Sequence, residues 1–233
     1  APEGDAAEHE RDVRRLFQTF VPKEVVDKII HGLEDGKPVI EEVKTITLLN
    51  IDIRGFSRTA HRIGPPKTVA LLNRFFEAMG DLVFKHHGIV DKYIGDGFLA
   101  VFGAPVSSVS DPDNALLAAL DMKRTLAGLN LQLSRELGQT IEMGISVHTG
   151  EVVAGNIGFE KKMDYTVIGD AVNTVFRLQG LAKAFPNGIL ISDATLRSVR
   201  SRPVVHAVSP PADFPTDLSE LKVYELLELD KPS

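Results

Sequence analysis

The sequence predicts an α+β domain with a ferredoxin-like βαββαβ core and a C-terminal α/β extension. Three observations predict this fold: a strand-like apolar run over 43–53, an amphipathic helical stripe over 67–86, and two short apolar runs on either side of Gly95-Asp96-Gly97. A further helical segment over 112–137 and strand-like runs after it complete the order. The length of 233 residues favours one large domain with a short appendage.

Periodicity and turn residues set the element boundaries. Ahead of the core, residues 8–35 carry apolar side chains every three or four positions with a break at Pro22, which predicts two short helices. The hairpin over 89–102 places Asp96 at its tip. The second half is predicted to contain strands over 141–149 and 152–157 joined by a turn at Gly150-Glu151, an extended piece over 165–168, a helix over 171–183 with Asp170 as N-cap, and strands near 188–192, 203–208 and 222–229.

Composition and charge exclude several classes of protein. The 43% of hydrophobic and 25% of charged residues are typical of an ordinary globular domain. A formal charge of -6, a pI near 5.7 and the lack of a basic stripe argue against nucleic-acid binding, so a phosphate-bearing partner should be small. Without cysteine there is no disulfide, thiolate zinc site or cysteine nucleophile, which fits a reducing compartment such as the cytoplasm.

The ends of the chain suggest a piece of a longer protein. No apolar run approaches the roughly eighteen residues that a membrane span needs, so we expect no membrane contact by this segment. The chain starts at Ala1 without methionine, and any anchor or sensor would lie outside this sequence.

Two aspartates stand where strand-like runs break into glycine. Asp52 closes the run Leu48-Leu49-Asn50-Ile51, and Asp96 lies between Gly95 and Gly97. Each alone has an ordinary explanation as a cap or turn residue. Together they predict a metal site, because a ferredoxin-like core places its first strand beside the hairpin. Divalent cations such as Mg²⁺ commonly use one or two carboxylates while substrate phosphates complete the shell, so the pair suggests phosphoryl chemistry.

A second candidate group lies on the helix predicted over 171–183. Asn173 and Arg177 are four residues apart and therefore share one face. Asn173 falls in the first turn, where backbone N–H groups and the helix dipole favour anions. The planar guanidinium of Arg177 can hold a phosphate through two hydrogen bonds. The ordinary alternative is a solvated helix face.

Lys92 and Thr166 are candidates of a third kind. Their ordinary explanations are a solvent-facing lysine and a strand residue. As readers of a nucleotide base, the lysine would donate to a ring nitrogen and the hydroxyl would meet an exocyclic amine.

In order along the chain, four motifs resemble the catalytic domain of the class III nucleotide cyclases, which make cyclic AMP or cyclic GMP from the triphosphate. The resemblance runs from about Val43 to Leu229, and it implies a nucleotide cyclase catalytic domain over 43–233 preceded by an N-terminal helical connector over 1–42. The motifs are Asp52-Ile53-Arg54-Gly55-Phe56-Ser57, Lys92-Tyr93-Ile94-Gly95-Asp96-Gly97, Thr166-Val167-Ile168-Gly169-Asp170 and Val172-Asn173-Thr174-Val175-Phe176-Arg177.

The resemblance implies roles for these residues. Asp52, Asp96 and the backbone carbonyl of Ile53 would bind two divalent cations, Mg²⁺ or Mn²⁺. Asn173 would orient the ribose and Arg177 would meet negative charge at the α-phosphate, so both are expected to be catalytic. Lys222 is the candidate contact for the terminal phosphates. Lys161-Lys162 stand where the family usually has a second arginine.

Lys92 and Thr166 fall where the family reads the base, and this pair resembles the adenine-selective bacterial subgroup. A lysine can donate to N1 of adenine, whereas N1 of guanine carries a hydrogen. The resemblance therefore implies an adenylate cyclase, a phosphorus–oxygen lyase that converts ATP to 3′,5′-cyclic AMP and pyrophosphate. The alternatives are a guanylate cyclase and a catalytically weak ATP-binding regulatory domain.

The family resemblance also implies a homodimer. The metal aspartates come from one chain, and Lys92, Thr166, Asn173 and Arg177 come from the other. Regulatory domains in a longer parent chain would be fused to the connector, in keeping with a role in signal transduction.

Overall fold

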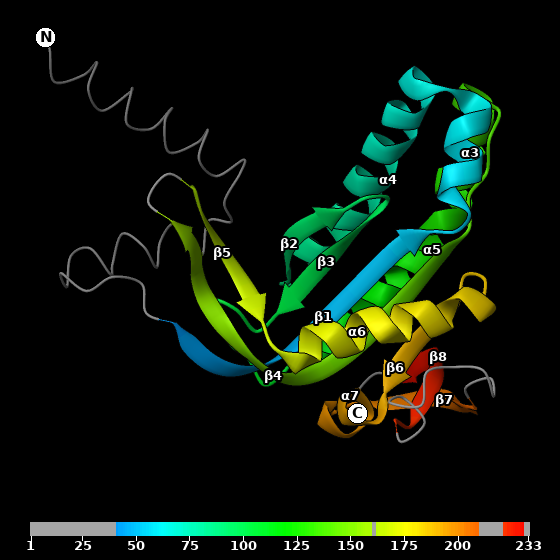
Figure 1. The fold of residues 1–233 in the computed structure, drawn as a ribbon. Coiled ribbons are helices and arrows are strands. Elements are labelled where there is room, and N and C mark those ends of the chain that lie inside the picture. Colours follow the sequence, from blue (N-terminus) through cyan, green and yellow to red (C-terminus); the bar gives the residue numbers. More distant parts are fainter. Residues whose placement is uncertain (1–40, 160–161, 210–220, 231–233) are drawn as a thin grey trace, which may run out of the picture.

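The structure, a computed structural model, describes residues 41–159, 162–209 and 221–230 (Figure 1). The predicted connector over 1–42 lies outside the described residues except for its last two. The described elements are β1 (Glu42–Ile53), α3 (Phe56–Ile63), α4 (Pro65–Lys85), β2 (Ile89–Ile94), β3 (Gly97–Phe102), α5 (Asp111–Leu137), β4 (Met143–Phe159), β5 (Lys162–Ile168), α6 (Asp170–Leu181), the 3₁₀-helix η1 (Ala182–Ala184), β6 (Ile189–Ser192), α7 (Asp193–Ser198), β7 (Arg202–Val208) and β8 (Val223–Asp230).

In the described part of the chain, eight strands form one mixed sheet in the order β2-β3-β1-β4-β6-β8-β7, with β5 paired to β4 beside this path. β1 lies between β3 and β4 and is antiparallel to both, whereas β6 runs parallel to β4. The predicted α+β fold with a ferredoxin-like core and a C-terminal extension is confirmed.

Helices cover both faces of the sheet (Figure 1), and the side chains of β1 alternate between the two layers. Leu49 and Ile51 pack against α4 and α5, while Ile46 and Leu48 pack on the face that carries α6. β1 is therefore buried from both sides, and its end holds Asp52 in a rigid position. No helix in the described ranges is long and apolar enough to cross a membrane.

The predicted turn at Gly150-Glu151 is wrong. Residues 143–159 form one continuous strand, and Gly150 and Glu151 pair with Ile46 and Thr45 of β1. Glycine is needed at 150 because α6 approaches closely: an added Cβ would lie 2.8 Å from the Cβ of Ala171. Steric demand, rather than a turn, explains this glycine.

Three further details differ from the prediction. Asp170 is the first helical residue of α6 and not its N-cap, which is Gly169. The short helices α3 and α7 were not predicted. α3 is only eight residues long, and although Phe56 and Ile63 pack against the core none of its residues is fully buried, so its apolar stripe is too short to stand out in the sequence.

Candidate active site

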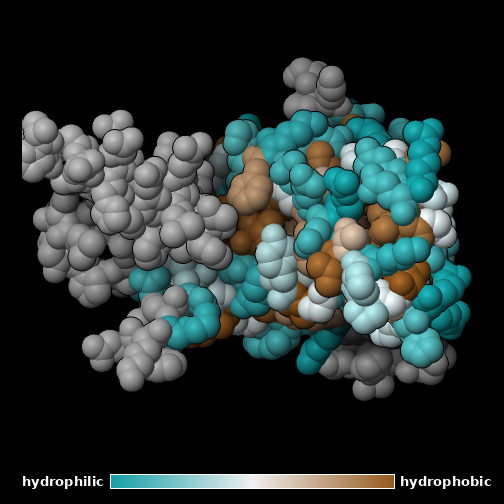
Figure 2. Space-filling view, turned by 90° about the horizontal axis from the view of Figure 1, so that it is seen from above, coloured by the Kyte–Doolittle hydropathy of each residue, from teal (hydrophilic) through white to brown (hydrophobic). Residues whose placement is uncertain are grey.

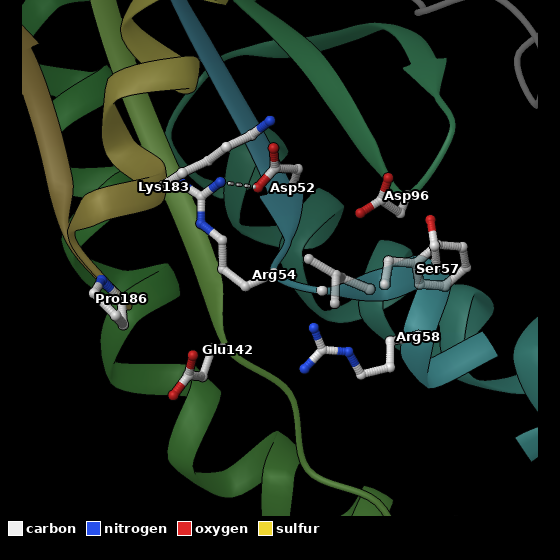
Figure 3. A pocket seen from close by; sticks show the side chains of 11 residues that line it. Asp52, Arg54, Ser57, Arg58, Asp96, Glu142, Lys183 and Pro186 are labelled. Atoms are coloured by element: carbon white, nitrogen blue, oxygen red, sulfur yellow. Dashed lines mark ion pairs between the residues drawn. The ribbon is translucent and has the colours of Figure 1, made fainter. Parts of the chain in front are cut away.

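Asp52 and Asp96 lie at the same end of two paired strands. Asp52 is opposite Gly97 in the β1–β3 ladder, and the backbone N–H of Ile53 donates to the carbonyl of Asp96 over 3.3 Å. Both aspartates and Ile53 line one cleft of about 550 Å³ (Figure 3). The structure thus brings together the three groups that the sequence predicts as metal ligands.

Asp52 has glycines opposite it on both neighbouring strands, Gly97 on β3 and Gly144 on β4. Arg54 uses the space that Gly144 leaves, because a Cβ there would collide with its guanidinium. Nη1 of Arg54 lies 2.9 Å from Oδ1 of Asp52, and the arginine side chain is only 11% exposed. The absence of a side chain at Gly144 therefore leaves room in the cleft for the charged pair of Arg54 and Asp52.

Burial raises the pKa of Asp52, and the positive charges of Arg54 and Lys183 oppose that rise. Burial also raises the pKa of Asp96, and the negative charge of Asp52 adds to it. The charge of Asp52 thus raises the cost of a charge on Asp96, and a cation held by both carboxylates would lower that cost.

The donor set fits a hard divalent cation. Oδ1 of Asp52 is buried and has an ion pair but no hydrogen-bond partner, which leaves acceptor capacity in the cleft. The described residues contain no cluster of three or more histidine, cysteine, aspartate or glutamate side chains suited to a metal. Two carboxylates and a backbone carbonyl match Mg²⁺ or Mn²⁺ sites in which substrate phosphates provide further ligands.

Lys92 and Thr166 meet although they are far apart in sequence. Nζ of Lys92 donates to Oγ1 of Thr166 over 2.7 Å, which joins β2 to β5. Oγ1 of Thr166 in turn donates to Oδ2 of Asp91 over 2.9 Å. The structure thus assembles the predicted base-reading pair and adds an aspartate to it.

Asn173 and Arg177 lie one turn apart on α6, and both are exposed. Neither lines the described clefts that contain Asp52, even though Phe176 between them lines a second cleft of about 240 Å³ with Asp52 and Asp96. Lys222 is exposed before β8 and also lines neither cleft. Lys162 pairs with Asp164 at 3.0 Å, and Lys161 lies outside the described residues.

Sequence reasoning missed three cations that share the cleft with the aspartates: Arg54, Arg58 and Lys183. Figure 3 shows Lys183 reaching toward Asp52 while Arg58 lies across the cleft. The position of Arg54 directly after Ile53 was a usable signal. Lys183 offered no such signal, because it reaches the cleft from the 3₁₀-helix η1 after α6 and no local pattern connects it with Asp52.

The mixed sheet, with one acidic residue at the end of β1 and another in the β2–β3 turn, agrees with the fold and site expected of a nucleotide cyclase catalytic domain. A family model described as the adenylate and guanylate cyclase catalytic domain matches residues 39–209. The chain belongs to this family, and it is a class III cyclase domain.

Relatives with both base specificities resemble the chain. An adenylate cyclase of Anabaena cylindrica is 35% identical over 188 residues, which cover 78% of this chain and 36% of that protein. The guanylyl cyclase Cya2 has a TM-score of 0.73 and 34% identity over 82% of this chain and 96% of that chain. The adenylyl cyclase CyaB from P. aeruginosa has a TM-score of 0.74 and 25% identity over 81% and 96%.

The chain spans about a third of the length of the curated relatives it matches. Catalytic domains of this family act on nucleotides and generally use divalent metals. Both adenylate and guanylate cyclases are among the relatives, so similarity alone does not decide between ATP and GTP as the substrate. That choice has to be argued from the residues of the site.

Proposed function

We propose that this chain is an adenylate cyclase that converts ATP to 3′,5′-cyclic AMP and pyrophosphate at sites shared by two copies. The contact between Lys92 and Thr166 is the observation that carries the proposal. A lysine ammonium beside a threonine hydroxyl matches the ring nitrogen and the amine of adenine.

The metal half-site consists of Asp52, Ile53 and Asp96. These residues would hold two divalent cations through two carboxylates and one carbonyl. Bound there, the cations supply the charge that lowers the pKa of the ribose 3′-hydroxyl and neutralises the phosphates. Arg54 keeps the carboxylate of Asp52 in place, while Arg58 and Lys183 add positive charge where a triphosphate would lie.

The base half-site consists of Lys92, Thr166, Asn173 and Arg177. Asn173 would orient the ribose by hydrogen bonds, and Arg177 would bind the charge that develops on the α-phosphate. The proposed contact of Lys222 with the terminal phosphates stays a prediction.

Two copies would complete each site. In one chain Asn173 and Arg177 do not reach the clefts of Asp52, so the half-sites within the described residues stay separate. Large apolar side chains are exposed near the base readers: Tyr93 is 61% exposed and Ile168 49%. Figure 2 shows apolar areas among hydrophilic side chains on one face of the molecule. An apolar, partly polar face of this kind suits a two-fold interface.

The remaining proposals concern the parent protein. We assign residues 43–233 to the catalytic domain and 1–42 to a connector from regulatory domains, in line with the greater length of the relatives. The cytoplasmic location stays a prediction.

Product identification tests the proposed activity. The protein is incubated with ATP or GTP and with Mg²⁺ or Mn²⁺, and the products are identified by mass. We expect cyclic AMP and pyrophosphate from ATP, with Asp52→Asn as the inactive control. Cyclic GMP as the main product would support a guanylate cyclase instead. Bound ATP without any cyclic product would support a regulatory domain.

A further inference from the structure

Strand β2 contains an irregularity beside the base-reading pair. Val90 pairs with Ala100 and Lys92 pairs with Leu99, so Asp91 is an extra residue without a partner on β3. In a regular strand, adjacent side chains point to opposite faces. A bulge changes that direction, and here Asp91 and Lys92 both reach the hydroxyl of Thr166.

The three side chains form a closed set of polar contacts. Oδ2 of Asp91 lies 3.1 Å from Nζ of Lys92 and 2.9 Å from Oγ1 of Thr166, while Lys92 and Thr166 are 2.7 Å apart. The side chain of Asp91 is 2% exposed, whereas that of Lys92 is 41% exposed. Asp91 therefore lies beneath the two residues that a base can reach.

The positions of the hydrogens follow from this arrangement. An ionised carboxylate only accepts, so the single hydroxyl hydrogen of Thr166 goes to Asp91. The threonine oxygen also accepts from Lys92, which leaves one lone pair for a ligand. Burial raises the pKa of Asp91, while the adjacent ammonium of Lys92 favours its charged form. To a ligand, Thr166 is an acceptor and Lys92 is a donor.

We propose that Asp91 determines the base preference of the site by fixing Thr166 as a hydrogen-bond acceptor beside the donor Lys92. The inference rests on the proposed function, in which these two residues contact the base. Adenine presents an acceptor at N1 and a donor at its amine, which complements the pair. Guanine presents a hydrogen at N1 and an acceptor at O6, so both of its groups face a group of the same kind.

Asp91 acts as a positioning residue in this scheme, because it touches the base only through Thr166 and Lys92. Replacing its carboxylate by an amide removes that control. In Asp91→Asn the amide can donate to Thr166, and the hydroxyl hydrogen is then free to point at O6 of guanine. The shape of the buried site changes little.

The experiment measures kcat/KM for ATP and for GTP. In Asp91→Asn we expect the ATP-to-GTP ratio to fall at least about tenfold, through a higher KM for ATP and improved turnover of GTP. Asp164→Asn is the matched control, because Asp164 lies on β5 but its side chain is 64% exposed. Its ratio should match that of the wild type. An unchanged ratio in a folded Asp91→Asn protein would overturn the inference.

Variants of Thr166 test the same scheme without touching the buried carboxylate. Thr166→Ser keeps the hydroxyl and should keep the ratio, while Thr166→Val should lower it. Adding Asp91→Asn to Thr166→Val should then change the ratio less than about threefold, because the hydroxyl that Asp91 fixes as an acceptor is gone and only its ion pair with Lys92 remains. Independent effects of the two substitutions would contradict the scheme.

Failure of the inference can be told apart from failure of the proposed function. If Lys92→Ala and Thr166→Val leave the ratio unchanged, the two residues do not contact the base and the proposed base half-site is wrong. If both lower the ratio while Asp91→Asn does not, only the role of Asp91 is wrong.

Discussion

Nη1 of Arg54 lies 2.9 Å from Oδ1 of Asp52, so one of the two proposed metal ligands is paired with a cation of its own chain. A metal ion at Asp52 therefore meets the positive charge of Arg54 at close range. The arginine both orients the carboxylate and opposes the incoming ion, and the second effect should dominate because Coulomb repulsion is strong in a half-buried cleft.

Replacing the arginine should strengthen metal binding. In Arg54→Met, which keeps the volume but removes the charge, we expect Mn²⁺ to bind about five- to tenfold more tightly without nucleotide, roughly 1 to 1.4 kcal/mol. Titration calorimetry measures the change. The exposed Arg58 lines the same cleft, and Arg58→Met should change the affinity less than about twofold. Weaker binding by Arg54→Met would mean that ordering of Asp52 is the larger effect.

Mixing of inactive variants should restore activity if two copies share each site. Asp52→Ala and Asn173→Ala should each lose about 10² to 10³ in rate. Random mixing in equal amounts places one intact site in each mixed dimer, so about a quarter of the wild-type activity should return. A mixture of Asp52→Ala with Asp96→Ala is the control and should stay inactive, because both residues belong to the metal half-site. No recovery in the first mixture would place the whole site within single chains.

Acid should destabilise the fold through His148. Burial lowers the pKa of this side chain from 6.5 to about 4, and its Nδ1 contacts the hydroxyl of Ser192 over 2.8 Å. His148 binds a proton near pH 6.5 in the unfolded chain but only near pH 4 in the folded chain. The free energy of unfolding is therefore unaffected by this histidine above pH 6.5 and falls as the pH drops from 6.5 to about 4. Over this pH range, His148 is expected to lower the free energy of unfolding by about 2 to 3 kcal/mol.

Urea unfolding at several pH values measures this effect. His148→Gln should unfold with a shallower dependence on pH between 6.5 and 4 than the wild type. The exposed His206 on β7 provides the control, and His206→Gln should leave the dependence unchanged. An identical pH profile for His148→Gln would show that other groups control acid unfolding.

Gly97 should tolerate no side chain. Its added Cβ would collide with the backbone carbonyl of Ile51, which cannot move without breaking the β1–β3 ladder. Gly97→Ala should therefore lower the free energy of unfolding by about 3 kcal/mol. Gly128 lies in α5 with nothing within 4 Å of an added Cβ, so Gly128→Ala should raise stability by about 0.5 to 1 kcal/mol. Equal losses in both variants would contradict the steric argument.

The parts of the fold that were predicted from sequence have strong local patterns. β1, the β2–β3 hairpin and the helices α4 and α5 each bury a regular set of apolar residues, so periodicity identified them. The sequence also predicted that Asp52 and Asp96 lie at the same end of the sheet, because a ferredoxin-like core places β1 beside β3.

The remaining features depend on contacts between distant segments. Gly150 was taken for a turn because the approach of Ala171 is invisible in the sequence. Asp91 gave no signal, since a bulge in β2 and not a motif turns it toward Thr166. The roles proposed for Asn173, Arg177 and Lys222 stay predictions, because they require a second chain.

Strand β4 runs without interruption from Gly144, opposite Asp52, to Gly155, opposite Thr166. In the proposed dimer, Asp52 and Thr166 of one subunit belong to different catalytic centres. Strand β4 of each subunit would then run from one centre to the other. If substrate binding moved β4 at one centre, the movement would be transmitted to the other centre, because no loop interrupts the strand between them. In the proposed dimer, β4 would therefore connect the two centres mechanically, and binding at one is expected to be felt at the other.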